Sequence, residues 1–514
     1  MPGLFTVHDQ SAYPAPSAVY NWRVYALAFS AAMGSSMFGY DSAFIGGAMS
    51  LPAFKTKFGL SATSGNSLAA LKANIVSTFQ AGCFFGAILC YPLSERLGRR
   101  IPLLICGLIF NLGVILQLTS TGHIGMIYAG RALTGVAVGA SSLIVPQYIS
   151  EWSPPAIRGR LIGVFEILLQ FSQVVGFWVN YGVNENIPKT SESQWLIPFA
   201  LQLVPRSLLV ILMFFQPESP RWLLKANRAE QAIKNLIRIR KLPESDNYIM
   251  WEVETIREQL ERENELGADK SFFQKLKEAF ATGNRNRLII GMSLMMLQNL
   301  SGINALNYYS PTIFQSIGFS GTSVGLLATG VFGLVKAFGT LAFIIFGIDK
   351  LGRRRSLLIG SFGAMIAMFY LAGYSNISGS FHGKAKQDGG AYAAIVMIYL
   401  FAIFYAMSWN GVPWIFCAEW LGQFIIVYST PYMMNNISYG TFLFFGCSLV
   451  FGSLVVMLFM PETKGLCLEE MDILFAIDGL AHNKRAKADE IIGEMRTTEA
   501  VVGQVAGKGD SDQV

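Results

Sequence analysis

The stretch ERLGRR at residues 95–100 decides the fold, because a related stretch, DKLGRRR, recurs at residues 349–355. Each copy lies between two long apolar runs and leaves room for only a short turn. In membrane proteins Lys and Arg accumulate in cytosolic loops, so a short basic turn between two bilayer-length helices is expected on that side. The two turns therefore predict a membrane protein and mark one of its faces.

The two turns are part of a longer internal repeat. Lys350 follows Arg96 by 254 residues (350 minus 96), and a second related motif comes four apolar runs after each turn. That motif is PESPRW at residues 217–222 in the first half and PETKG at residues 461–465 in the second. Transporters are commonly built from parallel repeats of this kind. The pattern predicts one helical bundle that is present twice.

Composition places the chain in the membrane. Of its 514 residues, 52% are hydrophobic and 14% are charged, and the mean hydropathy is +0.43, whereas a soluble domain has about 25% charged residues. Many apolar stretches exceed the roughly 20 residues that a helix needs to cross a bilayer. We expect an all-α polytopic protein, and its formal charge of +6 indicates basic cytosolic loops, not a nucleic-acid surface.

Changes in composition divide the chain into five parts. Charged sequence with helical periodicity separates two apolar halves, and polar or charged sequence flanks them. We expect a cytosolic tail at 1–22, a six-helix bundle at 23–224, a cytosolic helical linker at 225–286, a second bundle at 287–471 and a cytosolic tail at 472–514. Both termini should therefore face the cytosol.

The residues that other function classes require are not evident in the sequence. The six cysteines show neither a disulfide framework nor metal-ligand spacing, so packing is their expected role. No nucleophile–base pair and no cluster of metal ligands stands out. We therefore expect no enzyme activity, no metal, no cofactor and no nucleic-acid partner, while the oligomeric state stays open.

One acidic and one basic residue lie isolated in apolar spans of the first half. Asp41 stands in the middle of the first span, and Arg131 is the only cation of the fourth. A charge inside a membrane span is costly and usually functional, and a buried Arg needs an anionic partner. We expect the two to pair, either as a switchable proton-carrying pair or as a permanent structural ion pair.

Polar side chains in three further spans cannot be satisfied by hydrocarbon. Glu166 and Gln173 are seven residues apart and share one helix face. Amides follow at Gln298 and Asn304 in the first span of the second half, and Lys336 lies in the middle of the next span. Because amides both donate and accept hydrogen bonds, these groups predict a cavity for a polyhydroxylated solute.

The eleventh span is too short to cross a bilayer. Residues 420–434 would form a helix of about 22 Å, against a hydrocarbon core of about 30 Å. From the basic turn to the later motif is 121 residues in the first half (217 minus 96) but 111 in the second (461 minus 350). We expect about 15–20 residues to be missing after Glu419, so that helix 11 is truncated.

Taken together, these motifs resemble the sugar porter family of the major facilitator superfamily over nearly the whole chain. The repeated motifs and QNLSGINALNYYSP at 298–311 carry the resemblance, and SWNGVPW at 408–414 looks most like fungal quinate permeases. The resemblance implies twelve helices in two six-helix halves that rock about a central site. It also implies that Asp41 and Arg131 match the proton-coupling pair of the symporting members.

The resemblance further implies a substrate pocket with three departures from the hexose carriers. Glu166 stands where they have glutamine, Asn299 replaces a second glutamine and Lys336 replaces an asparagine. These departures weigh against a plain hexose, and Lys336 either binds a substrate carboxylate or pairs with Glu166. The residues that match pocket positions are Glu166, Gln173, Gln298, Asn299, Asn304, Tyr308, Lys336 and Trp414.

A second set of residues matches the cytosolic gating motifs of the family. Its members are Glu95, Arg96, Gly98, Arg99, Arg100, Glu151, Arg158, Glu218, Arg221, Asp349, Gly352, Arg353, Arg354, Glu419 and Glu462.

The leading hypothesis is a multi-pass plasma-membrane transporter that imports quinate or a related polyhydroxylated compound together with protons, by alternating access. Its partners would be that small molecule, protons and the lipid bilayer. One alternative is a hexose transporter. Another is a transport-defective or sensor-like member of the family, which the truncated helix 11 favours.

Overall fold

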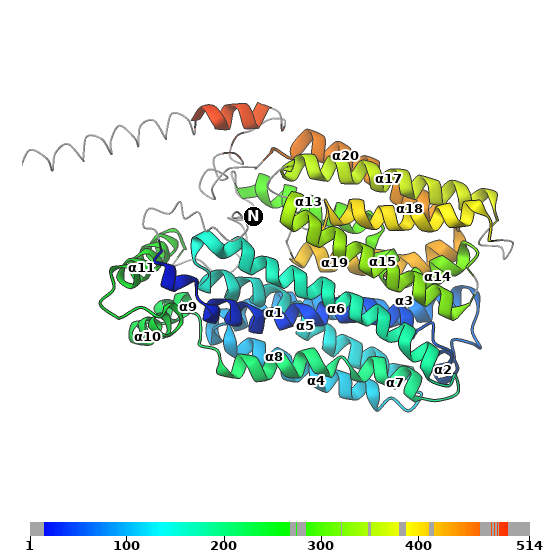
Figure 1. Cartoon of the computed structure of the whole chain (residues 1–514), viewed down its shortest axis with the longest axis horizontal. Helices are drawn as coiled ribbons and strands as arrows, with labels where there is room; N and C mark the ends of the chain where they lie inside the picture. The colour runs from blue at the N-terminus through cyan, green and yellow to red at the C-terminus, as the bar shows by residue number, and fades with distance from the viewer. Residues whose placement is uncertain are drawn as a thin grey trace, which may run out of the picture.

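The computed structural model describes residues 15–267, 274, 284–319, 321–347, 351–379, 387–410, 416–462, 474, 477, 481 and 483–491. Within those ranges the protein is helical and contains no strand, which confirms the predicted fold class. Figure 1 shows two lobes of long helices, one from each half of the chain, lying side by side.

The first half consists of six long rods, the last of which is broken. A short helix, α2 (Pro52–Lys57), connects the first rod to the second. The rods are α1 (Trp22–Ala48), α3 (Gly65–Leu97), α4 (Arg100–Leu118), α5 (Ile124–Trp152), α6 (Arg158–Asn186) and the pair α7 (Ser193–Ala200) and α8 (Leu203–Phe215). The linker that follows contains α9 (Pro220–Lys225), α10 (Ala229–Arg240) and α11 (Asn247–Gly267).

The second half begins with a rod that is broken at Gly302, between α13 (Asn284–Leu300) and α14 (Ile303–Ser316). Gly302 has a φ of +92°, a left-handed conformation that glycine adopts without a steric penalty, so the chain changes direction there. The remaining elements are α15 (Thr322–Ala342), the π-helical η3 (Phe343–Gly347), α17 (Arg353–Ile377), α18 (Gly389–Ala406), α19 (Phe416–Asn436) and α20 (Gly440–Phe459).

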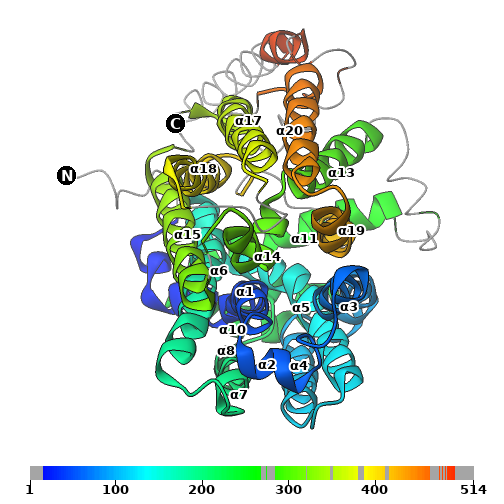
Figure 2. The ribbon, with the colours of Figure 1, turned by 90° about the vertical axis from the view of Figure 1, so that its right-hand side faces the viewer.

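The two halves meet along three pairs of helices. Across the interface α3 contacts α19, α6 contacts α15 and α1 contacts α14, as the end-on view of Figure 2 shows. Within the first half α3 packs closely on α5, where a Cβ added at Gly139 would lie 1.9 Å from the carbonyl oxygen of Cys83. Small residues permit such close approach between membrane helices.

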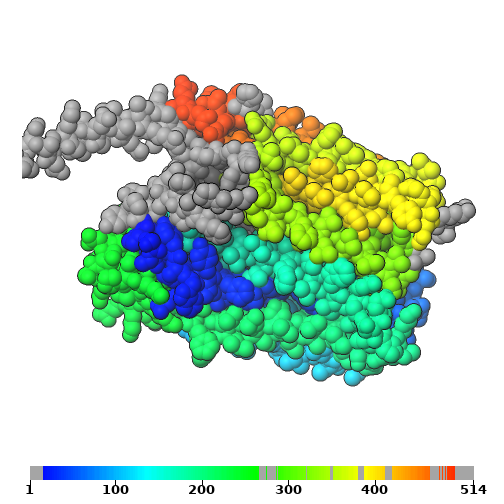
Figure 3. Space-filling view, in the orientation of Figure 1, coloured from blue at the N-terminus to red at the C-terminus, as the bar shows by residue number. Residues whose placement is uncertain are grey.

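The outer surface of both lobes is apolar. Ten helices within the described ranges are long and apolar enough to cross a membrane. Phe85, Leu108, Phe214, Phe338 and Phe362 each expose more than half of their surface. Figure 3 shows one outer face of the two lobes in a space-filling view. Extensive exposure of large apolar side chains is unusual for a soluble protein, so we assign these faces to lipid.

The two ends of the molecule differ in charge. The linker helices α9 to α11 lie at one end, on the left of Figure 1. There the first basic turn, at Gly98, contacts Glu218 just before α9, and the second basic turn, at Gly352, contacts Glu462 just after α20. We call this end the basic-turn end.

The structure corrects the predicted bounds of helix 11. The preceding helix, α18, ends at Ala406, and α19 begins at Phe416, not at residue 420. With 21 residues, α19 is about 31 Å long. However, Tyr405 at the end of α18 and Glu419 at the start of α19 both line the central pocket described below.

The other end of α19 lies far from the basic turns. Asn435 donates to Asn66 at the start of α3, 2.6 Å away. Helix α19 therefore runs from the level of the central pocket to the end of the molecule that is opposite the basic-turn end. The same holds for α18, which starts after the 375–390 loop and ends beside the pocket. The truncation predicted for helix 11 is therefore shared, because both helices lack the half that would reach the basic-turn end.

Candidate functional site

The structure brings together the two isolated charges of the first half. Nη1 of Arg131 on α5 lies 2.7 Å from Oδ1 of Asp41 on α1, and both side chains are fully buried. Arg131 also donates through Nε to the carbonyl oxygen of Ile75 (3.2 Å) and lies over the ring of Phe79. The second carboxylate oxygen of Asp41 has no hydrogen-bond partner in the described part of the chain. One oxygen is thus held by the guanidinium while the other is available to a proton.

A polar pocket lies between the two halves, beside this pair. Six of the predicted pocket residues line it: Glu166, Gln173, Gln298, Asn304, Tyr308 and Lys336. Its volume is about 40 Å³, enough for a few water molecules and well below the roughly 300–1,000 Å³ of typical ligand sites. The pocket is therefore too small for a solute of ordinary ligand size, and the surrounding helices must separate before one can bind.

Lys336 binds an amide. Its Nζ, on α15, donates to Oε1 of Gln173 on α6 at 2.8 Å, and Gln173 in turn donates to Ser42 of α1 at 3.3 Å. Among the described residues no ion pair forms between Lys336 and Glu166. The side chain of Lys336 therefore has a neutral hydrogen-bond partner and no anionic one among the described residues.

Glu166 has other donors. Its Oε1 accepts from Nδ2 of Asn410 (2.6 Å), across the interface, and from Nε2 of Gln170 (2.7 Å), one turn along α6. The hydrogen bonds from Asn410 to Glu166 and from Lys336 to Gln173 therefore connect the two halves of the protein at the pocket. Asn410 follows α18 and was not among the predicted site residues; its place in the SWNGVPW motif is the signal that could have found it.

The amides around the break in the seventh rod differ in role. Gln298 donates through Nε2 to the hydroxyl of Tyr405 and to the carbonyl of Trp409, both at 3.0 Å. Asn299 does not line the pocket but supports it, since its Oδ1 accepts from Asn304 at 2.5 Å and its Nδ2 donates to Met295 at 2.8 Å. Trp414, the eighth predicted pocket residue, lies outside the described residues.

The pocket has more acceptors than donors to match them. Six of its oxygens lack a hydrogen-bond partner within the part of the chain that the structure describes: Glu166 Oε2, Gln298 Oε1, Asn307 Oδ1, Tyr308 Oη, Glu419 Oε2 and Gln423 Oε1. Buried acceptors without donors are costly. Hydroxyl groups of a solute would supply the donors that these oxygens need.

Glu419 lies in this pocket and not at the cytosolic gate for which the family motif proposed it. The side chain is 5% exposed, and its Oε1 accepts from Nε2 of Gln423 at 3.1 Å. The physical reason is the early reversal of the chain, which starts α19 at pocket depth. The pocket thus contains two carboxylates, Glu166 and Glu419, and one ammonium group, Lys336.

The gating residues of the first half form a closed network at the basic-turn end. Arg99 lies 3.0 Å from Glu151, and the backbone amides of Arg99 and Arg100 donate to Glu218 at 2.9 and 3.0 Å. Burial raises the pKa of the Glu218 carboxyl, although the backbone N–H groups of Arg99, Ser219 and Arg100 favour its charged form.

Gly98 makes this contact possible. Its φ is +90°, and an added Cβ would lie 2.5 Å from Oε2 of Glu218. Beside it, Glu95 pairs with both Arg99 and Lys225.

The second half repeats the local geometry of this turn. The backbone amides of Arg353 and Arg354 donate to Glu462 at 3.0 and 3.2 Å, and Gly352 has a φ of +80°. Each basic turn thus contacts the glutamate of the later motif in its own half, Glu218 in the first and Glu462 in the second. The recurrence of both motifs at the same place in the repeat is the sequence signal for these contacts.

The other proposed gating residues are spread over the basic-turn end. Arg96 is exposed and Arg158 begins α6. Arg221 contacts Gln259 and Glu263 of the linker helix α11, away from the turn. Asp349 lies outside the described residues.

Comparison with known proteins identifies the family of the chain. The chain matches the model of the family "Sugar (and other) transporter" over residues 27–475. It is 44% identical over 485 residues to a probable quinate permease of Neosartorya fischeri, covering 90% of this chain and 89% of that one. It is 42% identical over 503 residues to the quinate permease of Neurospora africana, covering 93% of both chains.

Solved structures with a similar fold include those of the xylose transporter XylE from E. coli. The partially occluded inward-open form gives a TM-score of 0.71 at 25% identity, covering 85% of this chain and 100% of that one. The proton:xylose symporter bound to 6-bromo-6-deoxy-D-glucose gives 0.72 at 26% identity, covering 88% and 99%.

Proposed function

Because the chain belongs to the sugar transporter family of the major facilitator superfamily, whose members are multi-pass membrane transporters and not enzymes, we propose that it imports quinate or a related polyhydroxylated carboxylate together with protons. The observation that carries this proposal is the contact between Lys336 and Gln173 in the central pocket. Quinate combines one carboxylate with several hydroxyl groups on a single ring.

The pocket offers a group for each part of such a solute. The hydrogen-bond partner of Lys336 is neutral, so a substrate carboxylate could pair with its ammonium group. A cation inside the membrane is favourable only when it is paired with an anion. The unmatched oxygens of Gln298 and Asn307 suit hydroxyl donors. A hexose would satisfy these oxygens but would leave Lys336 without an anion, which is why we rank it second.

Asp41 is the proton carrier in this proposal. Burial disfavours its charged form, while the adjacent guanidinium of Arg131 favours it, so small changes in access shift the balance between the two. The free oxygen of Asp41 is the atom to which the proton would bind. A permanent structural ion pair is the alternative, and isolated buried pairs of that kind contribute little to stability.

The orientation follows from charge. Basic residues accumulate on the cytosolic side of membranes, so we assign the basic-turn end and both termini to the cytosol and the protein to the plasma membrane. In this orientation the network of Arg99, Glu151 and Glu218 holds the cytosolic side of the first half closed. Alternating access would open it when the two halves rock about the pocket.

A defective or sensor-like carrier is the second candidate, and a specific observation favours it. Helices α18 and α19 reverse at pocket depth, and Glu419 lies in the pocket as a result. Bilayer thinning can compensate for a few ångströms of missing helix, but it cannot replace two helix halves at the cytosolic gate. Sequencing the transcript across codon 419 tests this candidate, because an additional in-frame segment there would identify a longer active form.

Uptake by purified protein in liposomes tests the substrate assignment. Labelled quinate should enter protein-containing vesicles and not empty ones, and unlabelled quinate should compete better than glucose. Equal competition by glucose would favour a hexose carrier. Absence of uptake of both solutes by the 514-residue chain, with uptake by a longer form, would favour the defective carrier.

A further inference from the structure

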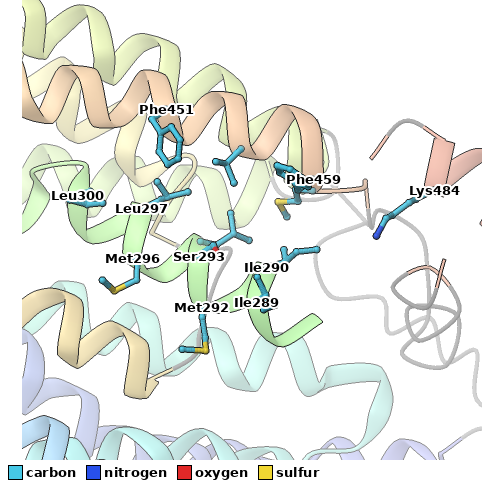
Figure 4. A pocket seen from close by; sticks show the side chains of 13 residues that line it. Ile289, Ile290, Met292, Ser293, Met296, Leu297, Leu300, Phe451, Phe459 and Lys484 are labelled. Atoms are coloured by element: carbon cyan, nitrogen blue, oxygen red, sulfur yellow. The ribbon is translucent and has the colours of Figure 1, made fainter. Parts of the chain in front are cut away.

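A second cavity, apolar and outside the central pocket, has a volume of about 670 Å³. It lies between α13 and α20 at the basic-turn end, and Figure 4 shows its lining side chains. Ile289, Met292 and Leu297 line it from α13, Phe451 and Phe459 from α20. This volume is within the range of ligand sites, whereas the central pocket is far smaller.

The early reversal of the chain accounts for this cavity. At its C-terminal end α13 meets α19, where Asn299 donates to the carbonyl of Glu419 and packs on Gly422. The three turns of α13 before that point lie beyond the start of α19 and line the cavity instead. Helix halves that extended to the basic-turn end would cover this flank of α13.

The cavity is open to the surroundings of the protein. Ile289 and Met292 expose 49% and 41% of their surface, and Phe451 and Phe459 expose 60% and 49%. Both helices belong to spans that are long and apolar enough to cross a membrane, so we assign the opening to the lipid-facing surface. An apolar cavity of this size that opens to lipid is suited to hydrocarbon, not to a polar solute.

A buried cation stands at one end of the cavity. Lys484 lines it and is only 4% exposed, and in the described ranges it makes neither a hydrogen bond nor an ion pair. The next residue fixes the segment in place, because Arg485 donates to the carbonyl of Glu462 at 2.9 Å. A largely buried lysine without a counterion is unfavourable, so this position suits an anion.

We propose that the cavity binds an anionic phospholipid, with an acyl chain between α13 and α20 and the phosphate on Lys484. Phe451 and Phe459 are eight residues apart, about 12 Å along α20, which is close to the depth of one leaflet of the roughly 30 Å core. Basic pockets between membrane helices on the cytosolic side bind anionic head groups. The proposal rests on the orientation assigned above but not on transport itself.

This lipid replaces the missing packing of α18 and α19. It fills the space beside α13 with hydrocarbon and neutralises Lys484, and so it stabilises the second half in its truncated form. The lipid is therefore a structural ligand, and its binding is measured independently of uptake.

Lipid-dependent stability of the purified full chain tests the head-group contact. Phosphatidylserine should raise the midpoint of thermal unfolding more than phosphatidylcholine with the same acyl chains. Lys484→Ala should reduce this preference about fivefold, as expected for one basic residue at an anionic surface, whereas Lys487→Ala, at an exposed position three residues on, should leave it unchanged. Equal protection by the two lipids, or equal effects of the two variants, would overturn the proposal.

Cross-linking tests the acyl-chain site. Phosphatidylserine with a photoreactive acyl chain should label α13 or α20 in vesicles. Ser293→Trp fills the cavity and should reduce the labelling, whereas Ser448→Trp adds the same ring to a half-buried position of α20 that does not line the cavity and should not. Labelling that Ser293→Trp leaves unchanged, or a cross-link to a second copy of the chain in place of lipid, would contradict the proposal. Because quinate uptake is measured separately, loss of transport with lipid binding intact would refute only the proposed function.

Discussion

Glu151 lies 3.0 Å from Arg99 at the basic-turn end, and this ion pair has no counterpart formed by Glu419 in the second half. Glu419 ends the related motif of that half, yet it lies in the central pocket beside Gln423. The two halves thus repeat the basic turn and its later glutamate but differ in the acid that follows the fourth helix. Because of this difference, the pocket that binds the substrate contains a second acidic side chain, Glu419, in addition to Glu166.

Removing the charge of Glu419 should strengthen quinate binding. A substrate carboxylate near Lys336 would be repelled by this second acid, and like charges brought together cost up to several kcal/mol. Glu419→Gln should lower the apparent KM for quinate about tenfold and should change glucose uptake little. A lower KM for both solutes alike would show that the variant opens the pocket and that charge is not the cause.

Lys336→Asn should abolish quinate uptake and permit hexose uptake. The variant removes the cation for the substrate carboxylate but keeps an amide at that position. Because Lys336 bonds to Gln173 and not to Glu166, Glu166→Gln should fail to rescue it. Equal loss of both solutes, restored in the double variant, would instead identify Lys336 and Glu166 as a structural pair.

Gly98→Ala should destabilise the protein more than Gly59→Ala. Both glycines have positive φ values, +90° and +74°, but a Cβ at Gly98 also meets Glu218, whereas the space around Gly59 is open. Left-handed backbone alone costs roughly 1–2 kcal/mol for other residues, and the contact with Glu218 adds to this. The unfolding midpoints of the two purified variants measure the difference. Equal decreases would mean that the Glu218 side chain can move away from an added Cβ without a free-energy cost.

Glu218 should make stability depend on pH in a defined direction. Burial raises its pKa in the folded protein above the value of about 4.3 in an unfolded chain, so the folded state binds the proton more tightly. Protonated Glu218 therefore adds to the free energy of unfolding below about pH 4, and this stabilisation is lost as the pH rises through the folded-state pKa. Thermal unfolding should be measured for the wild type and for Glu218→Gln across this pH range. The unfolding midpoint of the wild type should fall relative to that of the variant as the pH rises. A difference that is constant with pH would contradict this.

The sequence predicted those features that depend on one element or on an exact repeat. Asp41 and Arg131 could be paired because Asp41 is the only acid of its helix and Arg131 the only base of its helix. The contacts of Glu218 and Glu462 with the basic turns could be expected because the motifs recur together. In each case the local pattern limits the partners to one.

The sequence could not predict features that depend on how helices of different halves face each other. Lys336 selects Gln173 over Glu166, two side chains on the same face of α6, and the choice is made by the packing of α6 against α15. Asn299 lies behind the pocket because the chain turns at Gly302, which interrupts the helical period between residues 298 and 304. The depth of Glu419 follows from the point where α18 and α19 reverse, which no local pattern encodes.

Accumulation of labelled quinate in liposomes under an imposed proton gradient tests the central claim most directly. With the outside acidic, the wild type should concentrate quinate above equilibrium, and dissipating the gradient should abolish this. Asp41→Asn should still exchange internal for external quinate but should not accumulate it, because the residue can no longer bind and release the proton. Accumulation by Asp41→Asn equal to that of the wild type, or accumulation without a gradient, would contradict proton coupling through Asp41.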